Sequence, residues 1–176
     1  MPVSKNNRKT KKVKKQKGYR PVRTLPGYKL VKETCKKIDD ILFETAKLAK
    51  IVGVMEDQFS PEHKIESQAH LRAIIEVLAP GKAVDANGVE IEYEAFPLRV
   101  SALEKEADKI AARAHADDLE FVPVLNMAEN YLSTLITGTG EAISQLAILV
   151  DTYAPREDGV SEVLEKQKEE TDVEHA

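Results

Sequence analysis

The sequence predicts a mainly α-helical fold, a bundle of four to five helices with a small β-hairpin, between a disordered basic N-terminal arm and an acidic C-terminal tail. Apolar residues recur at alternating spacings of three and four over most of residues 30–154, as they do on the buried side of a helix. The 176-residue chain has no Trp, four Phe and five Tyr, so its core is expected to be mostly aliphatic. We therefore divide the chain into an arm (1–29), a helical domain (30–154) and an acidic tail (155–176).

The first helix is expected over residues 31–57. Its core-facing seam consists of Ile38, Ile41, Thr45, Leu48, Val52 and Met55. The seam also fits a heptad register, but over too short a length to specify a coiled coil, so a bundle helix is the favoured interpretation. Before this helix, Pro21, Pro26 and Gly27 predict an extended or turned chain up to about Tyr28.

A second helix is predicted to start at Ser60-Pro61-Glu62. Ser60 is a good N-cap, proline suits the first turn, and an acid there is favoured by the helix dipole. The apolar pattern of this helix ends before Pro80-Gly81, where the chain has to turn.

Residues 82–95 differ from the helical segments and predict a small hairpin. Asn87-Gly88 is a two-residue hairpin turn signal. The strand after it alternates apolar residues with Glu90, Glu92 and Glu94, which gives it one acidic face. Its partner strand is placed at about 83–86, and an irregular connection is the alternative.

Two further helical regions complete the domain. Pro97 opens a helix with a seam of small residues that is expected to run to about residue 118. From Phe121 a second stripe begins, and it is interrupted at Gly138-Thr139-Gly140 before it resumes and ends at Pro155. We interpret this stripe as two helices joined at the glycines, with Thr139 as an N-cap; a single kinked helix is the alternative.

The N-terminal arm is the main functional signal. Residues 1–23 contain seven Lys and three Arg and no acid, so they carry +10 while the rest of the chain carries −14. Lysine and arginine that contact phosphates release condensed counterions, which drives binding with little sequence preference. The candidate nucleic-acid-binding residues are Lys5, Arg8, Lys9, Lys11, Lys12, Lys14, Lys15, Lys17, Tyr19, Arg20 and Arg23.

Tyrosines near these cations extend the hypothesis. Tyr19 is expected to stack on an exposed base, which favours single strands or RNA. Tyr28 has the same option, but anchoring the arm to the domain is its favoured role. Other readings of the whole arm are a nuclear import signal, a ligand for an acidic protein surface or anionic membrane, and a solubilising tail.

We identify no catalytic residue, no metal site and no cofactor motif. Cys35 is the single cysteine, which excludes an intramolecular disulfide and fits a reducing cytosolic compartment. Three constellations were weighed as sites and interpreted as ordinary helix surface or breaks: Glu62-His63-Glu66-His70, His115-Ala116-Asp117-Asp118 and Gly138-Thr139-Gly140-Glu141. No apolar run approaches the roughly 18–20 residues that span a bilayer, so no membrane insertion is expected.

These observations predict a non-enzymatic accessory protein, cytoplasmic or associated with a nucleoid or nucleus. Its arm is expected to bind DNA or RNA non-specifically, while the helices offer a surface to a protein partner or a second copy. The acidic tail is expected to compete with nucleic acid for the arm. The alternative from another class is a protein-interaction or assembly module, scaffold-like or an inhibitor of a host factor, without nucleic-acid function. An enzyme with a spatially assembled acidic site is a third possibility.

Overall fold

The computed structural model describes residues 22–154; the chain before residue 22 and after residue 154 lies outside the described part. The predicted mainly helical fold with a small hairpin is confirmed, with four α-helices and a two-stranded antiparallel sheet. The elements in order are η1 (Val22–Thr24), α1 (Pro26–Met55), η2 (Glu56–Gln58), α2 (Pro61–Leu78), β1 (Gly81–Val84), β2 (Glu90–Tyr93), α3 (Phe96–Ala111), η3 (Asp118–Phe121) and α4 (Val122–Tyr153).

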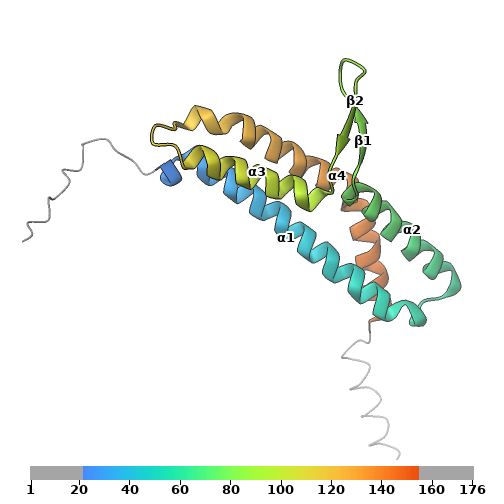
Figure 1. The fold of residues 1–176 in the computed structure, drawn as a ribbon. Coiled ribbons are helices and arrows are strands. Elements are labelled where there is room, and N and C mark those ends of the chain that lie inside the picture. The colour runs from blue at the N-terminus through green and yellow to red at the C-terminus, as the bar shows by residue number, and fades with distance from the viewer. Residues whose placement is uncertain (1–21, 155–176) are drawn as a thin grey trace, which may run out of the picture.

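The four helices pack into an elongated rod, with α1 and α4 running along its whole length (Figure 1). The two long helices, α1 and α4, run side by side in the same direction, and each is about 45 Å long at 1.5 Å per residue. The shorter helices α2 and α3 run in the opposite direction, and each covers one half of the α1–α4 pair. The hairpin projects sideways from the point where α2 ends and α3 begins.

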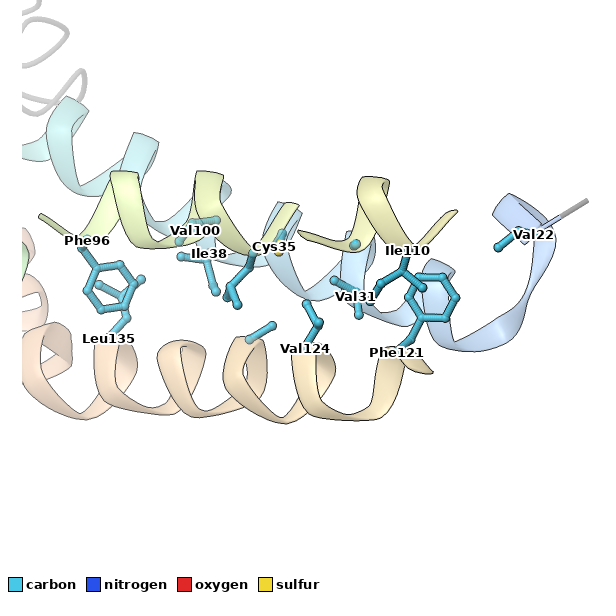
Figure 2. Close-up of a cluster of buried hydrophobic side chains, with 13 residues drawn as sticks. Val22, Val31, Cys35, Ile38, Phe96, Val100, Ile110, Phe121, Val124 and Leu135 are labelled. Atoms are coloured by element: carbon cyan, nitrogen blue, oxygen red, sulfur yellow. The ribbon is translucent and has the colours of Figure 1, made fainter. Parts of the chain in front are cut away.

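Two clusters of buried side chains hold the rod together. The first joins the beginning of α1 and α4 to α3, and Figure 2 shows Val31 of α1 between Ile110 of α3 and Val124 of α4. The second joins the far halves of α1 and α4 to α2, and its members are Val52, Phe59, Ile74, Ala142, Leu146 and Leu149. The buried side chains are mostly aliphatic, as the composition predicted, and each fully buried Leu, Ile, Val or Phe contributes about 1.5–3 kcal/mol.

Helix α1 begins earlier than predicted. Residues 22–29 were assigned to the arm, but they form η1 and the first turn of α1. Pro26 lies in that first turn, where a missing backbone N–H costs nothing. The N–H of Gly27 donates to Oδ1 of Asp118 at 2.8 Å, which ties the start of α1 to η3. The prediction read Pro26-Gly27 as a turn, whereas the proline starts the helix.

The predicted start and end of α2 are confirmed. Ser60 is its N-cap, and the Ser60 hydroxyl accepts the N–H of His63 at 3.3 Å. The hydroxyl of Tyr153, at the end of α4, accepts the N–H of Ser60 at 3.1 Å and lies 2.7 Å from Nδ1 of His63. The first turn of α2 is therefore held by the last turn of α4.

The hairpin is present, but its turn is longer than the predicted two residues. Strand β1 pairs with β2 from Gly81↔Tyr93 to Val84↔Glu90, which leaves residues 85–89 as the connection. Oδ1 of Asp85 accepts the N–H groups of Asn87 and Val89 at 2.9 and 2.8 Å. Gly88 has φ +81°, the left-handed conformation that glycine adopts without strain. Asn87-Gly88 thus belongs to a turn with a glycine bulge.

Helix α3 ends at Ala111, seven residues before the predicted end near 118. A separate cap starts the next element: Asp117 accepts the N–H groups of Leu119 and Glu120, and the Glu120 carboxylate accepts the N–H of Asp117. This capping box requires the chain to leave the helical conformation before Asp117. The residues between are mostly alanines, which favour a helix, so the local pattern concealed the break.

The predicted division at Gly138-Thr139-Gly140 is wrong, because α4 is one helix throughout. Figure 1 shows that it bends between the half that faces α3 and the half that faces α2. Thr139 is buried and is not an N-cap, since its hydroxyl donates to the carbonyl of Leu135 at 2.7 Å. A Cβ on Gly138 would lie 2.9 Å from Cγ2 of Val77, so this glycine lets α2 approach closely. Packing on both halves outweighs the roughly 1 kcal/mol that each glycine costs in a helix.

Candidate nucleic-acid interface

The root of the arm is fixed at one end of the rod. Val22 is buried in the first cluster, and Figure 2 shows it beyond Ile110 and Phe121, at the end of the body. Of the candidate nucleic-acid-binding residues, Arg23 lies in the described part, where it is exposed in η1. The others lie outside the described residues: Lys5, Arg8, Lys9, Lys11, Lys12, Lys14, Lys15, Lys17, Tyr19 and Arg20.

Tyr28 anchors the first turn of α1 to α3 and η3. Its hydroxyl donates to Oδ1 of Asp108 at 2.8 Å, and its ring meets Phe121 edge-on at 5.7 Å. Burial, and then the hydrogen bond to Asp108, raise the pKa of the Tyr28 hydroxyl. Because the ring and the hydroxyl both have partners in the body, Tyr28 is not available to stack on a base.

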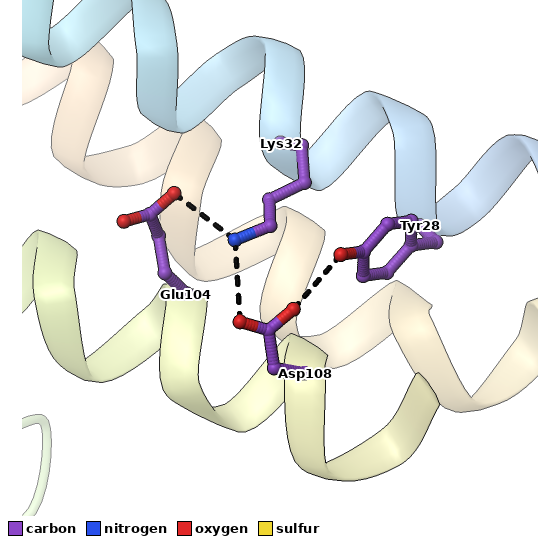
Figure 3. Close-up of polar contacts among 4 residues, drawn as sticks. All are labelled: Tyr28, Lys32, Glu104 and Asp108. Atoms are coloured by element: carbon purple, nitrogen blue, oxygen red, sulfur yellow. Dashed lines mark hydrogen bonds and ion pairs between the residues drawn. The ribbon is translucent and has the colours of Figure 1, made fainter. Parts of the chain in front are cut away.

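Lys32 is neutralised within the body by two carboxylates of α3 (Figure 3). Its Nζ lies 3.1 Å from Oε1 of Glu104 and 3.5 Å from Oδ2 of Asp108. Burial opposes the charge of Lys32, but the hydrogen bond and charge of Glu104 raise its pKa overall. The hydrogen bond from Tyr28, together with the charge of Lys32, lowers the pKa of Asp108. This cluster is a clamp between α1 and α3.

The clamp predicts an acid-dependent contribution to stability. A carboxyl group whose pKa is lowered by folding stabilises the fold above its ordinary pKa, which is 3.8, and this contribution is lost as the pH falls through the lowered value. We expect Asp108→Asn to lower the free energy of unfolding at pH 6, and the difference from the wild type to shrink below pH 3.8. Urea unfolding followed by circular dichroism at both pH values measures this. A difference that stays constant with pH contradicts the clamp.

Exposed lysines follow the arm root onto α1. Lys29 and Lys36 are seven positions apart and so share one face of the helix, and neither forms an ion pair with a residue of the described part, 22–154. Glu33 and Asp40 lie beside them on the same side, so this face is mixed in charge. Residues 22–154 hold 14 Lys and Arg against 22 Asp and Glu, so the described body is acidic. The excess positive charge of the chain therefore lies in the arm, and Lys29 and Lys36 are exposed lysines close to it on the described body.

The histidines and acids of α2 do not converge on one point. Nδ1 of His63 faces the Tyr153 hydroxyl, whereas Nε2 of His70 lies 3.7 Å from Oε1 of Glu66. Within residues 22–154, no group of three or more His, Cys, Asp and Glu side chains could hold a metal ion. The acids of the His115-Ala116-Asp117-Asp118 segment serve the backbone, as N-cap of η3 and as acceptor for Gly27.

Cys35 is buried between α1 and α3. Burial, and to a smaller degree the charge of Glu104, raise the pKa of its thiol to about 11. A thiolate is the reactive form of cysteine, so at neutral pH this thiol is inert and serves as a small apolar core residue.

A shallow groove of about 470 Å³ lies along the seam between α1 and α4. Its apolar lining comes from Ile41, Leu48 and Ile143, and Asp40 and Glu44 contribute carboxylates. The hydroxyl of Thr45 donates to the carbonyl of Ile41 at 2.7 Å, so it is occupied by the helix backbone. The groove therefore presents apolar surface rather than a nucleophile paired with a base.

Comparisons with protein-family models, curated proteins and solved structures found no match to this chain. None of the helices among residues 22–154 is long and apolar enough to cross a membrane.

Proposed function

We propose that this chain is a non-enzymatic accessory protein whose N-terminal arm binds nucleic acid without sequence preference. The observation that carries the proposal is the separation of charge: ten cations and no acid in residues 1–23, followed by an acidic body. A phosphate polyanion binds such a segment by releasing counterions, and the acidic body adds nothing to that attraction. Lysine predominates in the arm and acts as a point charge, which suits phosphates better than base edges.

Anchoring of the arm root supports this proposal. Val22 is buried and Tyr28 is held by Asp108, so the cations of the arm are attached to a rigid body at a defined end. Tyr19 is the one aromatic residue in 1–23, and it remains the candidate for stacking on an unpaired base. The helical rod would then hold a partner or a second copy at a fixed distance from the nucleic acid.

The test changes the charge of the arm without touching the body. We expect the full chain to bind generic DNA and RNA oligonucleotides with log K falling against log salt at a slope near −5, if about six phosphates are neutralised. Replacing the seven arm lysines by glutamine should abolish most of that slope, measured by fluorescence anisotropy at two salt concentrations.

Replacing the same lysines by arginine is the matched control, because the charge is kept while the residue type changes. This variant should retain the slope. Unchanged affinity in the glutamine variant would reject the proposal.

A second candidate function is self-association of the helical body as an assembly module. The observation that favours it is that two large apolar side chains of α1, Phe43 and Val54, are 68% and 75% exposed. Light scattering with and without nuclease separates the two candidates. A stable oligomer indifferent to nuclease favours assembly, and an oligomer lost on nuclease treatment favours nucleic-acid binding.

A further inference from the structure

The β-hairpin projects from the body and buries almost no surface against it. Both strands are exposed along nearly their whole length, and the apolar side chains Val84, Val89 and Ile91 are 68%, 57% and 48% exposed. An isolated two-stranded hairpin is marginally stable in water. Its sequence nonetheless defines it closely, through the Asp85 turn and the left-handed Gly88. A hairpin that is well defined but hardly buried is a candidate binding surface.

The base of the hairpin is clamped to the helices by an aromatic cage around Arg99. The Arg99 guanidinium lies 4.7, 4.3 and 5.4 Å from the ring centres of Tyr93, Phe96 and Tyr131, which belong to β2, α3 and α4. The Tyr93 ring also lies across Gly81, where a Cβ would be only 2.5 Å from its hydroxyl oxygen. The hairpin therefore projects from the middle of the rod at a fixed base (Figure 1).

Strand β2 carries two glutamates on one face of the hairpin. Glu90 and Glu92 of β2 point to the same face because side chains alternate along a strand, and both are well exposed. Lys82 of β1 contacts both carboxylates, at 2.9 and 3.4 Å, from the inner side. The outer side of β2 has no partner strand among the described residues, so its backbone groups remain a template for pairing.

The charges of Glu90, Glu92 and Lys82 determine which kind of segment can pair with the outer edge of β2. A second copy of β2 would place glutamates beside glutamates, and like charges on neighbouring strands repel. A strand added to β1 would lie beside Lys82 instead, which repels a cationic segment. An extended segment with lysines at alternate positions and one apolar residue between them would match β2, with its lysines beside Glu90 and Glu92 and its apolar residue beside Ile91.

Residues 11–15 of this chain, Lys-Lys-Val-Lys-Lys, have this pattern. In an extended conformation Lys12 and Lys14 share one face and Val13 takes the other. The reach is sufficient, since α3 spans about 24 Å from the hairpin base to the arm root, and the eight steps from Lys14 to Val22 extend about 26–29 Å at 3.3–3.6 Å each. We propose that residues 11–15 dock on the outer edge of β2 as a third strand within the same chain, held by Glu90 and Glu92.

This inference goes beyond nucleic-acid binding and does not require it. If the arm also binds phosphates, the two partners compete for the same lysines. A polyanion would then have to displace the arm from the hairpin before it could bind the arm.

The test places a nitroxide on the full chain at Gln16→Cys and observes backbone amide signals by NMR. Cys35 is buried with a pKa raised to about 11, so the label reacts at the new cysteine. We expect signal loss at residues 89–93 and none at the outer face of α2 around Gln68 and Arg72. The loss should disappear at about 1 M salt, where the Debye length is about 3 Å. Signals in β2 that are unaffected by the label would overturn the proposal.

Matched variants identify the charges responsible. Glu90→Gln with Glu92→Gln should restore the β2 signals, whereas Glu62→Gln with Glu66→Gln, the same change in charge on α2, should leave the signal loss intact. Equal behaviour of the two pairs would overturn the assignment to β2. A mixture of labelled and isotope-enriched unlabelled chains should show no signal loss, and loss there would overturn docking within one chain.

The outcomes separate this proposal from the proposed function. Unaffected β2 signals together with salt-dependent oligonucleotide binding reject the docking and leave nucleic-acid binding in place. Signal loss at β2 without oligonucleotide binding supports the docking and rejects nucleic-acid binding. If both hold, the hairpin pair of substitutions should raise oligonucleotide affinity several-fold over the α2 pair.

Discussion

Phe121→Ala is expected to lower the free energy of unfolding by about 3–5 kcal/mol, as truncation of a fully buried aromatic side chain does. Phe121 is 0% exposed and lies where η3 passes into α4. It meets the ring of Tyr28 at 5.7 Å and belongs to the cluster that joins α1, α3 and α4. The substitution would therefore open a cavity at the place where the arm root is fastened.

Urea unfolding at neutral pH measures this loss. Leu119→Ala is the matched control, because Leu119 lies two residues away in the same short helix and is 77% exposed. It should change the free energy of unfolding by less than about 0.5 kcal/mol. Similar losses in the two variants would show that Phe121 is not a core residue and that the end of the rod is packed differently.

Gly140→Pro is expected to cost about 3 kcal/mol or more, because proline removes a helix hydrogen bond and clashes with the carbonyl four residues earlier. Gly140 lies inside the continuous helix α4, where that carbonyl belongs to Ile136. Gly140→Ala should have the opposite sign. A Cβ there meets no atom within 4 Å, so alanine should stabilise the helix by about 0.5–1 kcal/mol.

The pair of substitutions also tests the alternative architecture directly. If α4 were two helices joined at the glycines with Thr139 as N-cap, position 140 would be the first residue of the second helix, where proline is well tolerated. A stable proline variant would therefore contradict the continuous helix. Thermal unfolding of both variants beside the wild type distinguishes the two cases.

Most of the helices could be predicted because helical spacing and caps depend on residues that are close together in the sequence. The seam from Ile38 to Met55 repeats at helical spacing, and Ser60-Pro61 combines a cap with a favourable first turn, so α1 and α2 were correctly identified. The errors came where tertiary contacts decide. Gly138 lies within a helix because α2 packs closely against it through Val77, despite the low helix propensity of glycine, and no local pattern contains that contact.

The candidate site was less accessible to sequence reasoning. Tyr28 and Lys32 look like members of the cationic arm and its continuation, yet Asp108 and Glu104, more than 70 positions away, commit them to the body. The aromatic cage of Arg99 likewise gathers residues from three elements. Pairings of this kind depend on how α3 lies along α1 and α4, which composition and periodicity do not specify.

The parallel arrangement of α1 and α4 gives the molecule electrical polarity. Val22 and Ala154, the residues from which the cationic and anionic extensions continue, lie at opposite ends of the rod (Figure 1). Residues 1–21 hold nine Lys and Arg without an acid, and residues 155–176 hold eight acids against three cations. The cationic and acidic segments therefore start at opposite ends of the described rod, so an approaching polyanion is attracted to the end at Val22 and repelled from the end at Ala154.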